Sequence, residues 1–380
     1  MKISEVKAYP LSFRVSDTGA VRLGIGRTVK RDAVVVKVST DSGLVGWGEA
    51  HHGRAPGSIA HLINTTLAHL VTGLDATDVV GAWDRVYRMQ LASHGMGAAA
   101  AIGLSGIDMA LWDLRGKAVD WPLYKLLGGR ARPIPAYAGG ISLGFQPAAQ
   151  LVEEARGLVA RGYRALKLRV GDTWRADVER VEAVRMSLGD AIELLVDANT
   201  NYTVDDVRQA MPAFDELRVG WLEEPFPPHD ARSYRMAAGL GRTPLAAGEN
   251  HYTRFEFHRV IDDGVISVLQ PDLSKTGGIT EGLRIAAMAS GWKLRINPHT
   301  SATGLNMAAT LHFLASIDNG GYYEGDAATE NLFRDELTSR GAGQIDRDGC
   351  VRPPEGAGLG VEIDEDFIRD HPVIEGPGYV

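Results

Sequence analysis

The sequence holds little cysteine, no long apolar run and no dense basic stretch. With Cys350 as its only cysteine, the chain cannot form an internal disulfide. No run approaches the roughly 18 apolar residues that a membrane-spanning helix needs, and the first residues, MKISEVKAYPLSF, lack the charged, apolar and small-residue zones of a secretory signal. A net charge of −8 without a basic cluster argues against nucleic acid as a partner. We therefore expect a cytoplasmic protein that binds neither a membrane nor nucleic acid.

The composition that is present suits a large globular core. The chain has 380 residues, of which 44% are apolar, and this length fits a barrel of about 250 residues plus one further module. Residues 1–50 alternate apolar and polar side chains, as in AVVVKVST and LVGWGEA, which predicts a small antiparallel sheet. From residue 58 to 127 the period becomes helical, and one side of a helix carries Ile102, Ile107, Ala110, Leu111 and Leu114. The first third is therefore expected to be α+β.

After Gly128 and Gly129 the pattern changes to strand-like runs that alternate with helical segments, which is typical of βαβ units. Seven of the eight runs are followed by a segment of helical period. Beyond the eighth run the chain returns to turns, as in PPEGAGLGVEID, and we expect this part to return to the first module. The eight runs are IPAYAG, RALKLR, IELLVD, GWLEE, PLAAGE, ISVLQPD, WKLRINPH and GYYEG.

Three carboxylates are equally spaced in the predicted barrel: Asp197 in LLVDAN, Glu223 in WLEEP and Glu249 in AAGEN. Each one closes an apolar run, and the interval suits one strand, one helix and two short loops, so all three are expected at one mouth of the barrel. Clustered carboxylates repel one another unless a cation lies among them, and oxygen ligands suit Mg2+ better than zinc. Glu224 is an alternative to Glu223 as a ligand. Asn199 either caps the following helix or contacts the metal shell.

The other strand ends add groups of a second kind. Lys167 and Arg169 point the same way because side chains alternate along a strand. The sixth run ends in Asp272 and the seventh in His299, so the carboxylate can bond one imidazole nitrogen while the other nitrogen faces the mouth as a general base. The eighth run carries Glu324. A metal cluster beside a base fits removal of a proton next to a carboxylate, since the resulting enediolate needs a cation on its oxygens.

These motifs together resemble the enolase superfamily and, within it, the mandelate racemase subgroup, over nearly the whole chain. The resemblance implies an α/β fold: a modified (β/α)7β TIM barrel, residues 128–345, with an N-terminal α+β capping domain, residues 1–127, completed by residues 346–380. It also implies a homo-oligomer, either a dimer or an octamer. The motifs, in the family's order, are GLVGWGEA, IGLSGIDMALWDLRGKAVDWPLYKLLGG, KLR, VDAN, WLEEP, GEN, QPDLSKTGG, NPH and PEGAGLG.

The same resemblance assigns roles to individual residues. It implies that the equally spaced acids bind Mg2+, that Asp272 and His299 form the subgroup's catalytic dyad, and that Glu324 donates a hydrogen bond to the substrate carboxylate when it carries a proton. The implied metal ligands are Asp197, Glu223 and Glu249.

The chain departs from the racemase pattern at the second strand, where Lys167-x-Arg169 replaces Lys-x-Lys. Because arginine is a poor base, this change disfavours racemisation and leaves His299 as the main base. Dehydration of a 2,3-dihydroxy acid fits better, since His299 can remove the α-proton and then protonate the departing hydroxyl. Lys167 and Arg169 would hold the substrate carboxylate. Lys167 could also serve as a second base if Arg169 and Mg2+ lower its pKa.

The substrate is expected to be a small polyhydroxylated sugar acid. Residues 22–31 and the loop 51–54 carry groups that bond hydroxyls or a distal carboxylate, and Arg27, His52 and Arg54 are the candidates. Lys275 is expected on the surface or in a substrate loop. The alternatives to a dehydratase are a racemase or epimerase, a sugar-lactone cycloisomerase, and a catalytically silent homologue that binds sugar acids.

Overall fold

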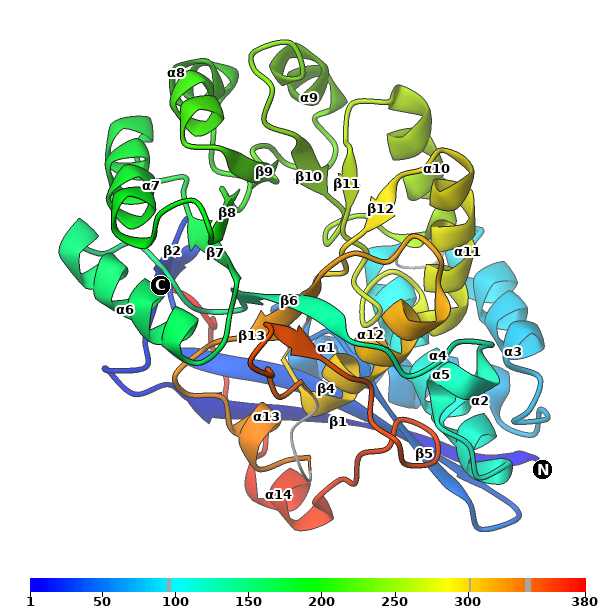
Figure 1. The fold of residues 1–380 in the computed structure, drawn as a ribbon. Coiled ribbons are helices and arrows are strands. Elements are labelled where there is room, and N and C mark those ends of the chain that lie inside the picture. Colours follow the sequence, from blue (N-terminus) through cyan, green and yellow to red (C-terminus); the bar gives the residue numbers. More distant parts are fainter. Residues whose placement is uncertain (94–96, 301, 339–342) are drawn as a thin grey trace.

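The computed structural model describes residues 1–93, 97–300, 302–338 and 343–380. Its N-terminal part is an antiparallel sheet of order β1-β4-β5, with a short hairpin, β2 and β3, between the first two strands (Figure 1). This sheet was predicted from the alternation of apolar and polar residues. The strands are β1 (Ile3–Arg14), β2 (Arg22–Leu23), β3 (Gly26–Arg27), β4 (Lys30–Thr40) and β5 (Val45–Ala50).

The helices of the cap follow, and the longest of them, α4, is buried on nearly all sides. It packs between β5 and α11, so the predicted one-sided apolar stripe was incomplete. Gly46 and Gly48 allow the close approach of β5, because a Cβ at either position would overlap a carbonyl oxygen of α4. The helical elements are α1 (Pro56–Leu62), η1 (Ile63–Leu67), α2 (Ala68–Val71), α3 (Val79–Val86), η2 (Tyr87–Leu91), α4 (Ala98–Ala118) and α5 (Leu123–Leu126), where η marks a π-helical turn.

The second part is a curled parallel sheet of order β12-β11-β10-β9-β8-β7-β6-β13. Ile296 forms a bridge to Gly320, just before β13, and this contact brings the two ends of the curled sheet together. Each of the eight predicted runs contains one strand. The strands are β6 (Ile134–Gly139), β7 (Ala165–Arg169), β8 (Glu193–Asp197), β9 (Val219–Glu223), β10 (Leu245–Ala247), β11 (Val268–Leu269), β12 (Arg295–Ile296) and β13 (Tyr323–Asp326).

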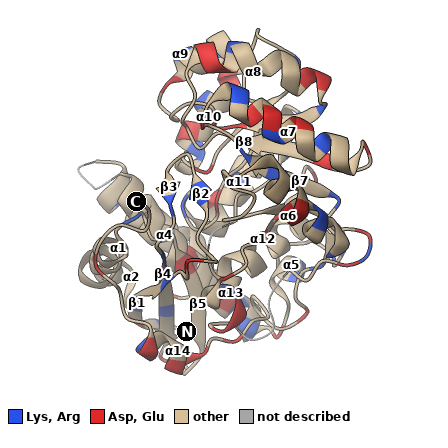
Figure 2. Cartoon of the chain, turned by 90° about the vertical axis from the view of Figure 1, so that its left-hand side faces the viewer, with Lys and Arg blue, Asp and Glu red and all other residues tan. Residues whose placement is uncertain are grey.

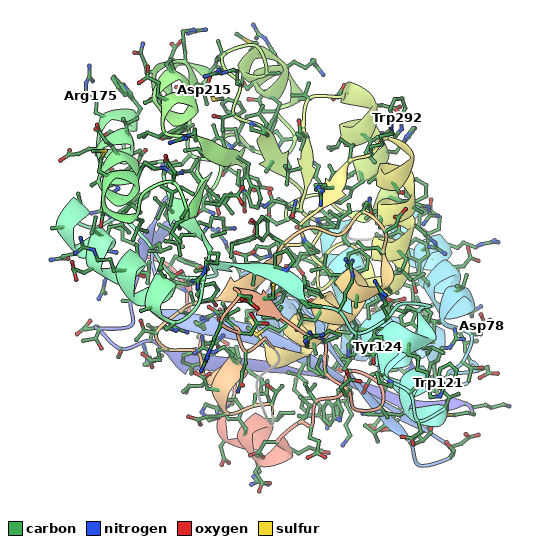
Figure 3. All side chains as sticks on the ribbon, in the orientation of Figure 1. Asp78, Trp121, Tyr124, Arg175, Asp215 and Trp292 are labelled. Atoms are coloured by element: carbon green, nitrogen blue, oxygen red, sulfur yellow. The ribbon has the colours of Figure 1, made fainter. Side chains whose placement is uncertain are left out.

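Seven helices alternate with these strands and surround the sheet, which confirms the modified (β/α)7β barrel (Figure 1). Their outer faces carry interspersed acidic and basic residues, as on α7 and α8 (Figure 2). Arg175 and Trp292 project outward from this ring, whereas side chains of the strands fill the interior (Figure 3). The helices are α6 (Ala148–Ala160), α7 (Trp174–Leu188), α8 (Val204–Glu216), α9 (Ala231–Ala237), α10 (Thr253–Asp263), α11 (Gly278–Gly291) and α12 (Gly304–Ser316).

The C-terminal segment returns to the cap. It contains α13 (Leu332–Asp335), β14 (Cys350–Val351), which pairs with β6, and α14 (Glu365–Asp370). Single bridges then join Leu11 to Pro372 and Thr28 to Tyr379. None of the described helices is long and apolar enough to cross a membrane. The last residues of the chain therefore lie beside the loop that follows β1.

Candidate active site

Buried charges meet where the strands of the barrel end. Lys167 on β7 has no exposed surface, and its Nζ lies 2.7 Å from Glu223 Oε1, 3.0 Å from Glu324 Oε1 and 3.5 Å from Asp197 Oδ2. Burial opposes its charge, but the carboxylates of Glu223 and Glu324 outweigh burial and hold the pKa of Lys167 well above its ordinary value. The arrangement favours Lys167 as a cation and gives no support to a second base with a lowered pKa.

Arg169, two residues further along β7, faces the same way. Its guanidinium bonds the carboxylate of Asp197 and the backbone oxygen of Gly140. Unlike Lys167, Arg169 lines the open pocket above the strand ends. A guanidinium at this point can contact a bound anion directly.

Asp272 and His299 form the expected pair, with 2.7 Å between Asp272 Oδ2 and His299 Nδ1. The other oxygen of Asp272 accepts from the backbone N and the hydroxyl of Ser274, each at 2.7 Å, and from Asn306 Nδ2 at 3.2 Å. This carboxylate is therefore fixed, and it places the proton of His299 on Nδ1. Nε2 faces Glu249 Oε2 at 2.8 Å.

The charge of His299 is set by its acidic neighbours. Burial lowers its pKa, but Glu249, Glu324 and the hydrogen bond to Asp272 together hold that pKa well above its ordinary value. In this arrangement the imidazole is a cation between two carboxylates. Its Nε2 could accept a proton only if the contact with Glu249 opened.

The two neighbouring glutamates of WLEEP face different ways. Glu223 points into the barrel, where Trp221 Nε1 at 3.1 Å and Gln270 Nε2 at 2.7 Å donate to its Oε2. Glu224 lines the pocket and has a positive φ of 35°. Burial, with the charge of Glu249, raises the pKa of Glu224 to about 8. Both acids are therefore candidate metal ligands, Glu223 from inside the barrel and Glu224 from the pocket.

The donors around Asp197 fit a hard cation. Asn199 lines the pocket and donates to both oxygens of Asp197, from its backbone N at 2.8 Å and from Nδ2 at 3.2 Å. Its own Oδ1 is buried and has no hydrogen-bond partner in the described part of the chain. Thr203, not Asn199, caps α8, in the predicted capping box with Asp206. An orphaned amide oxygen beside buried carboxylates is a donor set that Mg2+ prefers.

The acids are nevertheless engaged with cations of the protein itself. Glu223 contacts Lys167, and Asp197 contacts Arg169. Glu249 contacts His299. Among the described residues, no three His, Cys, Asp or Glu side chains are arranged as a coordination shell. Metal binding would therefore require these side chains to exchange partners.

Glu324 is expected from the resemblance to carry a proton and donate to the substrate carboxylate, but its neighbours are donors themselves. Its Oε1 accepts from the backbone N of Gly140 at 3.0 Å, and its Oε2 accepts from that of Thr300 at 3.2 Å. Burial raises its pKa, but Lys167, His299 and Arg169 outweigh this effect and lower the pKa to about 2. This arrangement favours an ionised acceptor and gives no support to a proton-carrying donor, because each oxygen of Glu324 faces a donor.

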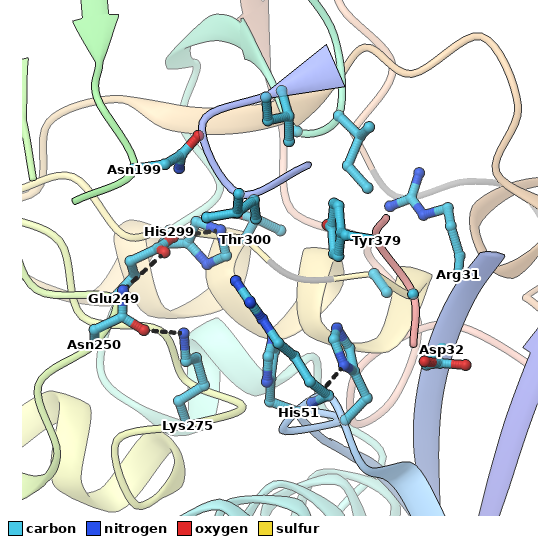
Figure 4. Close-up of a pocket in the computed structure, with 18 of the residues that line it drawn as sticks. Arg31, Asp32, His51, Asn199, Glu249, Asn250, Lys275, His299, Thr300 and Tyr379 are labelled. Carbon is cyan, nitrogen blue, oxygen red and sulfur yellow. Dashed lines mark hydrogen bonds and ion pairs between the residues drawn. The ribbon is translucent and has the colours of Figure 1, made fainter. Parts of the chain in front are cut away.

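Above the strand ends lies a pocket of about 200 Å3 between the barrel and the cap (Figure 4). Glu249, Asn250, Lys275 and His299 occupy one side of it. Lys275 is 5% exposed, and its Nζ donates to Asn250 Oδ1 at 3.1 Å. The surface location considered for Lys275 was therefore wrong, although it does belong to a loop at the pocket.

The cap supplies the opposite side of the pocket. His52 and Arg54 line it, as the sequence predicts, and so do Arg31 and Tyr379, which sequence reasoning missed. Arg27 does not line this pocket, because β3 turns its side chain to solvent, where it pairs with Asp17 at 3.0 Å. The only signal for Arg31 was its place in the basic segment RTVKRD.

Comparison with known families agrees with this geometry. A model for the N-terminal domain of mandelate racemase and muconate lactonizing enzyme matches residues 12–128, and a model described as enolase C-terminal domain-like matches residues 150–367. The chain belongs to the mandelate racemase/muconate lactonizing enzyme family. This confirms the resemblance to the enolase superfamily that the motifs suggested.

Relatives within the family carry several names. A 3,6-anhydro-alpha-L-galactonate cycloisomerase of Streptomyces coelicolor is 33% identical over 93% of this chain and 94% of its own. A D-galactonate dehydratase of Ralstonia nicotianae is 33% identical over 88% and 89%. Members of this family that resemble the chain thus include both isomerases and dehydratases.

Solved structures match along the whole length. A member of the enolase superfamily from a Polaromonas species is 56% identical, with a TM-score of 0.97 and full coverage of both chains. A racemase from Streptomyces coelicolor with bound magnesium is 29% identical, with a TM-score of 0.88 and coverage of 98% and 100%.

Proposed function

We propose that this protein is an Mg2+-dependent dehydratase that converts a polyhydroxylated sugar acid, an aldonate or aldarate, into a 2-keto-3-deoxy acid. The observation that carries the proposal is the position of His299. Asp272 holds its Nδ1, and its Nε2 meets Glu249 at the wall of a pocket whose floor is a cluster of buried carboxylates. A base beside such a cluster suits abstraction of an α-proton.

The fixed pair of Asp272 and His299 accounts for both proton transfers. Asp272 keeps the proton of the neutral imidazole on Nδ1, so Nε2 has a free lone pair once its contact with Glu249 opens. His299 Nε2 can then take the α-proton. The resulting imidazolium can give that proton to the departing β-hydroxyl. The substrate loses water, and the enol that remains becomes the keto acid.

The acids of the barrel would hold the cation. Asp197, Glu223 or Glu224, and Glu249 are the candidate ligands, and the free Oδ1 of Asn199 adds a neutral oxygen. When bound, Mg2+ would stabilise the negative charge that develops on the substrate carboxylate. Arg169, which lines the pocket, would hold that carboxylate in place.

An isomerase is the second candidate, because relatives include cycloisomerases of 3,6-anhydro-alpha-L-galactonate and of D-galactarolactone. Racemisation or epimerisation, cycloisomerisation and dehydration share the first proton transfer and differ in the fate of the intermediate. Incubation with Mg2+ and a panel of sugar acids and lactones in D2O separates them. Dehydration yields a keto acid that has lost water, cycloisomerisation opens a lactone or anhydro ring to a keto acid of unchanged mass, and epimerisation yields a deuterated sugar acid.

Substitution of His299 tests the catalytic assignment. His299→Asn keeps a polar side chain but removes the base, so kcat is expected to fall by at least about 100-fold. His258→Asn is the matched control, since His258 is an exposed histidine on α10 paired with Asp262. Unchanged turnover and deuterium exchange in the His299 variant would contradict the role of His299 as the base, and a wild type without either activity would favour a silent sugar-acid-binding homologue.

A homo-oligomer, dimer or octamer, is part of the same proposal. Sedimentation of the purified protein at several concentrations tests it.

A further inference from the structure

The cap side of the pocket contains a buried cation with a spare donor. Arg31 on β4 is 8% exposed, and its Nη2 lies 3.3 Å from Asp326 Oδ2. Its Nη1 is buried and has no hydrogen-bond partner in the described ranges of the chain. Figure 4 shows Arg31 beyond Tyr379, across the pocket from His299. Because an unmet buried donor is costly, a ligand acceptor is expected at this point.

The acids near Arg31 are already engaged. Asp32 Oδ1 accepts from Ser12 Oγ at 2.6 Å and pairs with Lys30 Nζ at 3.0 Å. Asp326 also accepts from the side chain of Asn331 and, at 3.0 Å, from the backbone N of residue 328. Arg31 therefore has Asp326 as its carboxylate partner through Nη2, while Nη1 keeps an unused donor.

Arg54 adds a second cation on the same side. Arg54 is exposed and lines the pocket, and its guanidinium lies 5.5 Å from the centre of the Tyr379 ring. The neighbouring imidazoles add no charge near neutral pH, because burial lowers the pKa of His51 well below its ordinary value and that of His52 to about 4. Arg31 and Arg54 thus leave this side positive, while the acids make the opposite side negative.

We propose that Arg31 and Arg54 form an anion subsite that binds a second carboxylate, at the end of the sugar acid distant from the reacting carbon. This inference rests on the proposed function and narrows the substrate class to dicarboxylic sugar acids, the aldarates. A planar guanidinium matches a carboxylate with two parallel hydrogen bonds. The cavity of about 200 Å3 suits a small ligand, and Arg31 and Arg54 line it, with Arg31 on the side opposite His299 (Figure 4).

The test compares aldonates and aldarates of the same configuration. The wild type is expected to show a kcat/KM about 10- to 100-fold higher for the aldarate than for the aldonate. This factor corresponds to the free energy of one hydrogen bond to a charged group. Arg31→Gln and Arg54→Gln should each reduce this ratio, the buried Arg31 more. Arg14→Gln is the matched control, because Arg14 is an exposed arginine at the end of β1, and it should keep the ratio. Partial misfolding lowers both rates and leaves their ratio unchanged.

Three outcomes would overturn the subsite: a wild-type ratio near one, a ratio that Arg31→Gln does not change, or a higher kcat/KM for an aldonate with a terminal phosphate. If no sugar acid is converted, the proposed function fails. The subsite is then tested separately, by calorimetric measurement of aldarate and aldonate binding. An aldarate that binds about tenfold more tightly than its aldonate, with the difference lost in Arg31→Gln, supports the subsite. Equal binding refutes it.

Discussion

At the scale of single residues, the mouth of the barrel contains more carboxylate side chains than cationic ones. Burial leads the causes that raise the pKa of Glu223 to about 7 and that of Glu224 to about 8. Burial disfavours the charged form of both acids, and neighbouring carboxylates add repulsion. A divalent cation would relieve this repulsion. The carboxylates are Asp197, Glu223, Glu224, Glu249, Asp272 and Glu324, and the cations are Lys167, Arg169, Lys275 and His299.

Thermal unfolding tests the cation directly. Mg2+ is expected to raise the Tm of the wild type, since a ligand at 100 times its Kd stabilises the folded state by about 2.7 kcal/mol. Asp197→Asn should remove most of this shift. Asp205→Asn, at an exposed acid paired with Arg208, should keep it. The absence of any shift in the wild type up to saturating Mg2+ would contradict the metal assignment.

Glu324→Gln distinguishes the two roles considered for that residue. A glutamine resembles a protonated glutamate, so a proton-donating role predicts little loss. If Glu324 is ionised, the substitution by glutamine removes the negative charge that Lys167 and two backbone N–H groups contact. We expect the free energy of unfolding to fall by on the order of 3 kcal/mol, with a large loss of kcat. Urea denaturation and steady-state kinetics measure both, and retention of wild-type values would restore the donor role.

The sequence could predict residues at strand ends, but on the cap side of the pocket it predicted His52 and Arg54 and could not separate Arg31 from Arg27. Asp272 and His299 follow apolar runs whose ends must meet in a barrel, so their proximity follows from the fold. Arg27 and Arg31 lie in the same basic segment, and the sequence does not show which of them is buried. That difference depends on the packing of the C-terminal segment and on Asp326 across the interface.

At the scale of elements, the barrel was predictable because each apolar run is flanked by helical segments. The last strands could not be delimited, since β11 and β12 comprise only two residues each within longer runs. The sequence pattern also did not predict that α4 is surrounded by other elements on several sides. Its glycines and small residues fit contacts on several sides, which a helical period alone does not reveal.

Gly48 tests the contact between β5 and α4. In Gly48→Ala the new Cβ would overlap the backbone oxygen of Gly106, so the free energy of unfolding should fall by about 1–3 kcal/mol or more. Gly157→Ala is the matched control, because nothing lies within 4 Å of the corresponding Cβ in α6, and alanine is the better helix former. Urea denaturation of both variants measures the difference. Equal stability would show that the sheet and helix can separate at little cost.

At the scale of the whole molecule, His312 on α12 joins the barrel to the C-terminal segment. Its Nδ1 accepts from the backbone N of Tyr124 at 3.1 Å, and its Nε2 faces the oxygen of Leu359 at 3.1 Å. These partners require a neutral imidazole with its proton on Nε2. Burial accordingly lowers the pKa of His312 to about 4.

This neutral histidine predicts a loss of stability in acid. Because the pKa is lower in the folded state, the contribution of His312 is complete above pH 6.5 and is lost as the pH falls toward 4. The slope is about 1.4 kcal/mol per pH unit. The difference in unfolding free energy between the wild type and His312→Gln should therefore shrink by about 2 kcal/mol from pH 7 to pH 5. A pH-independent difference, measured by urea denaturation, would contradict the neutral state.

The final residues of the chain form part of the pocket rim. The backbone N of Val29 donates to the oxygen of Gly378 at 3.0 Å, that of Arg27 donates to Val380 at 2.7 Å, and Tyr379 between them lines the pocket. Any affinity tag or fusion partner joined at Val380 would start one residue beyond Tyr379, beside this pocket. The amino terminus lies far from this point (Figure 1), so it is the end at which to attach such additions or to immobilise the protein.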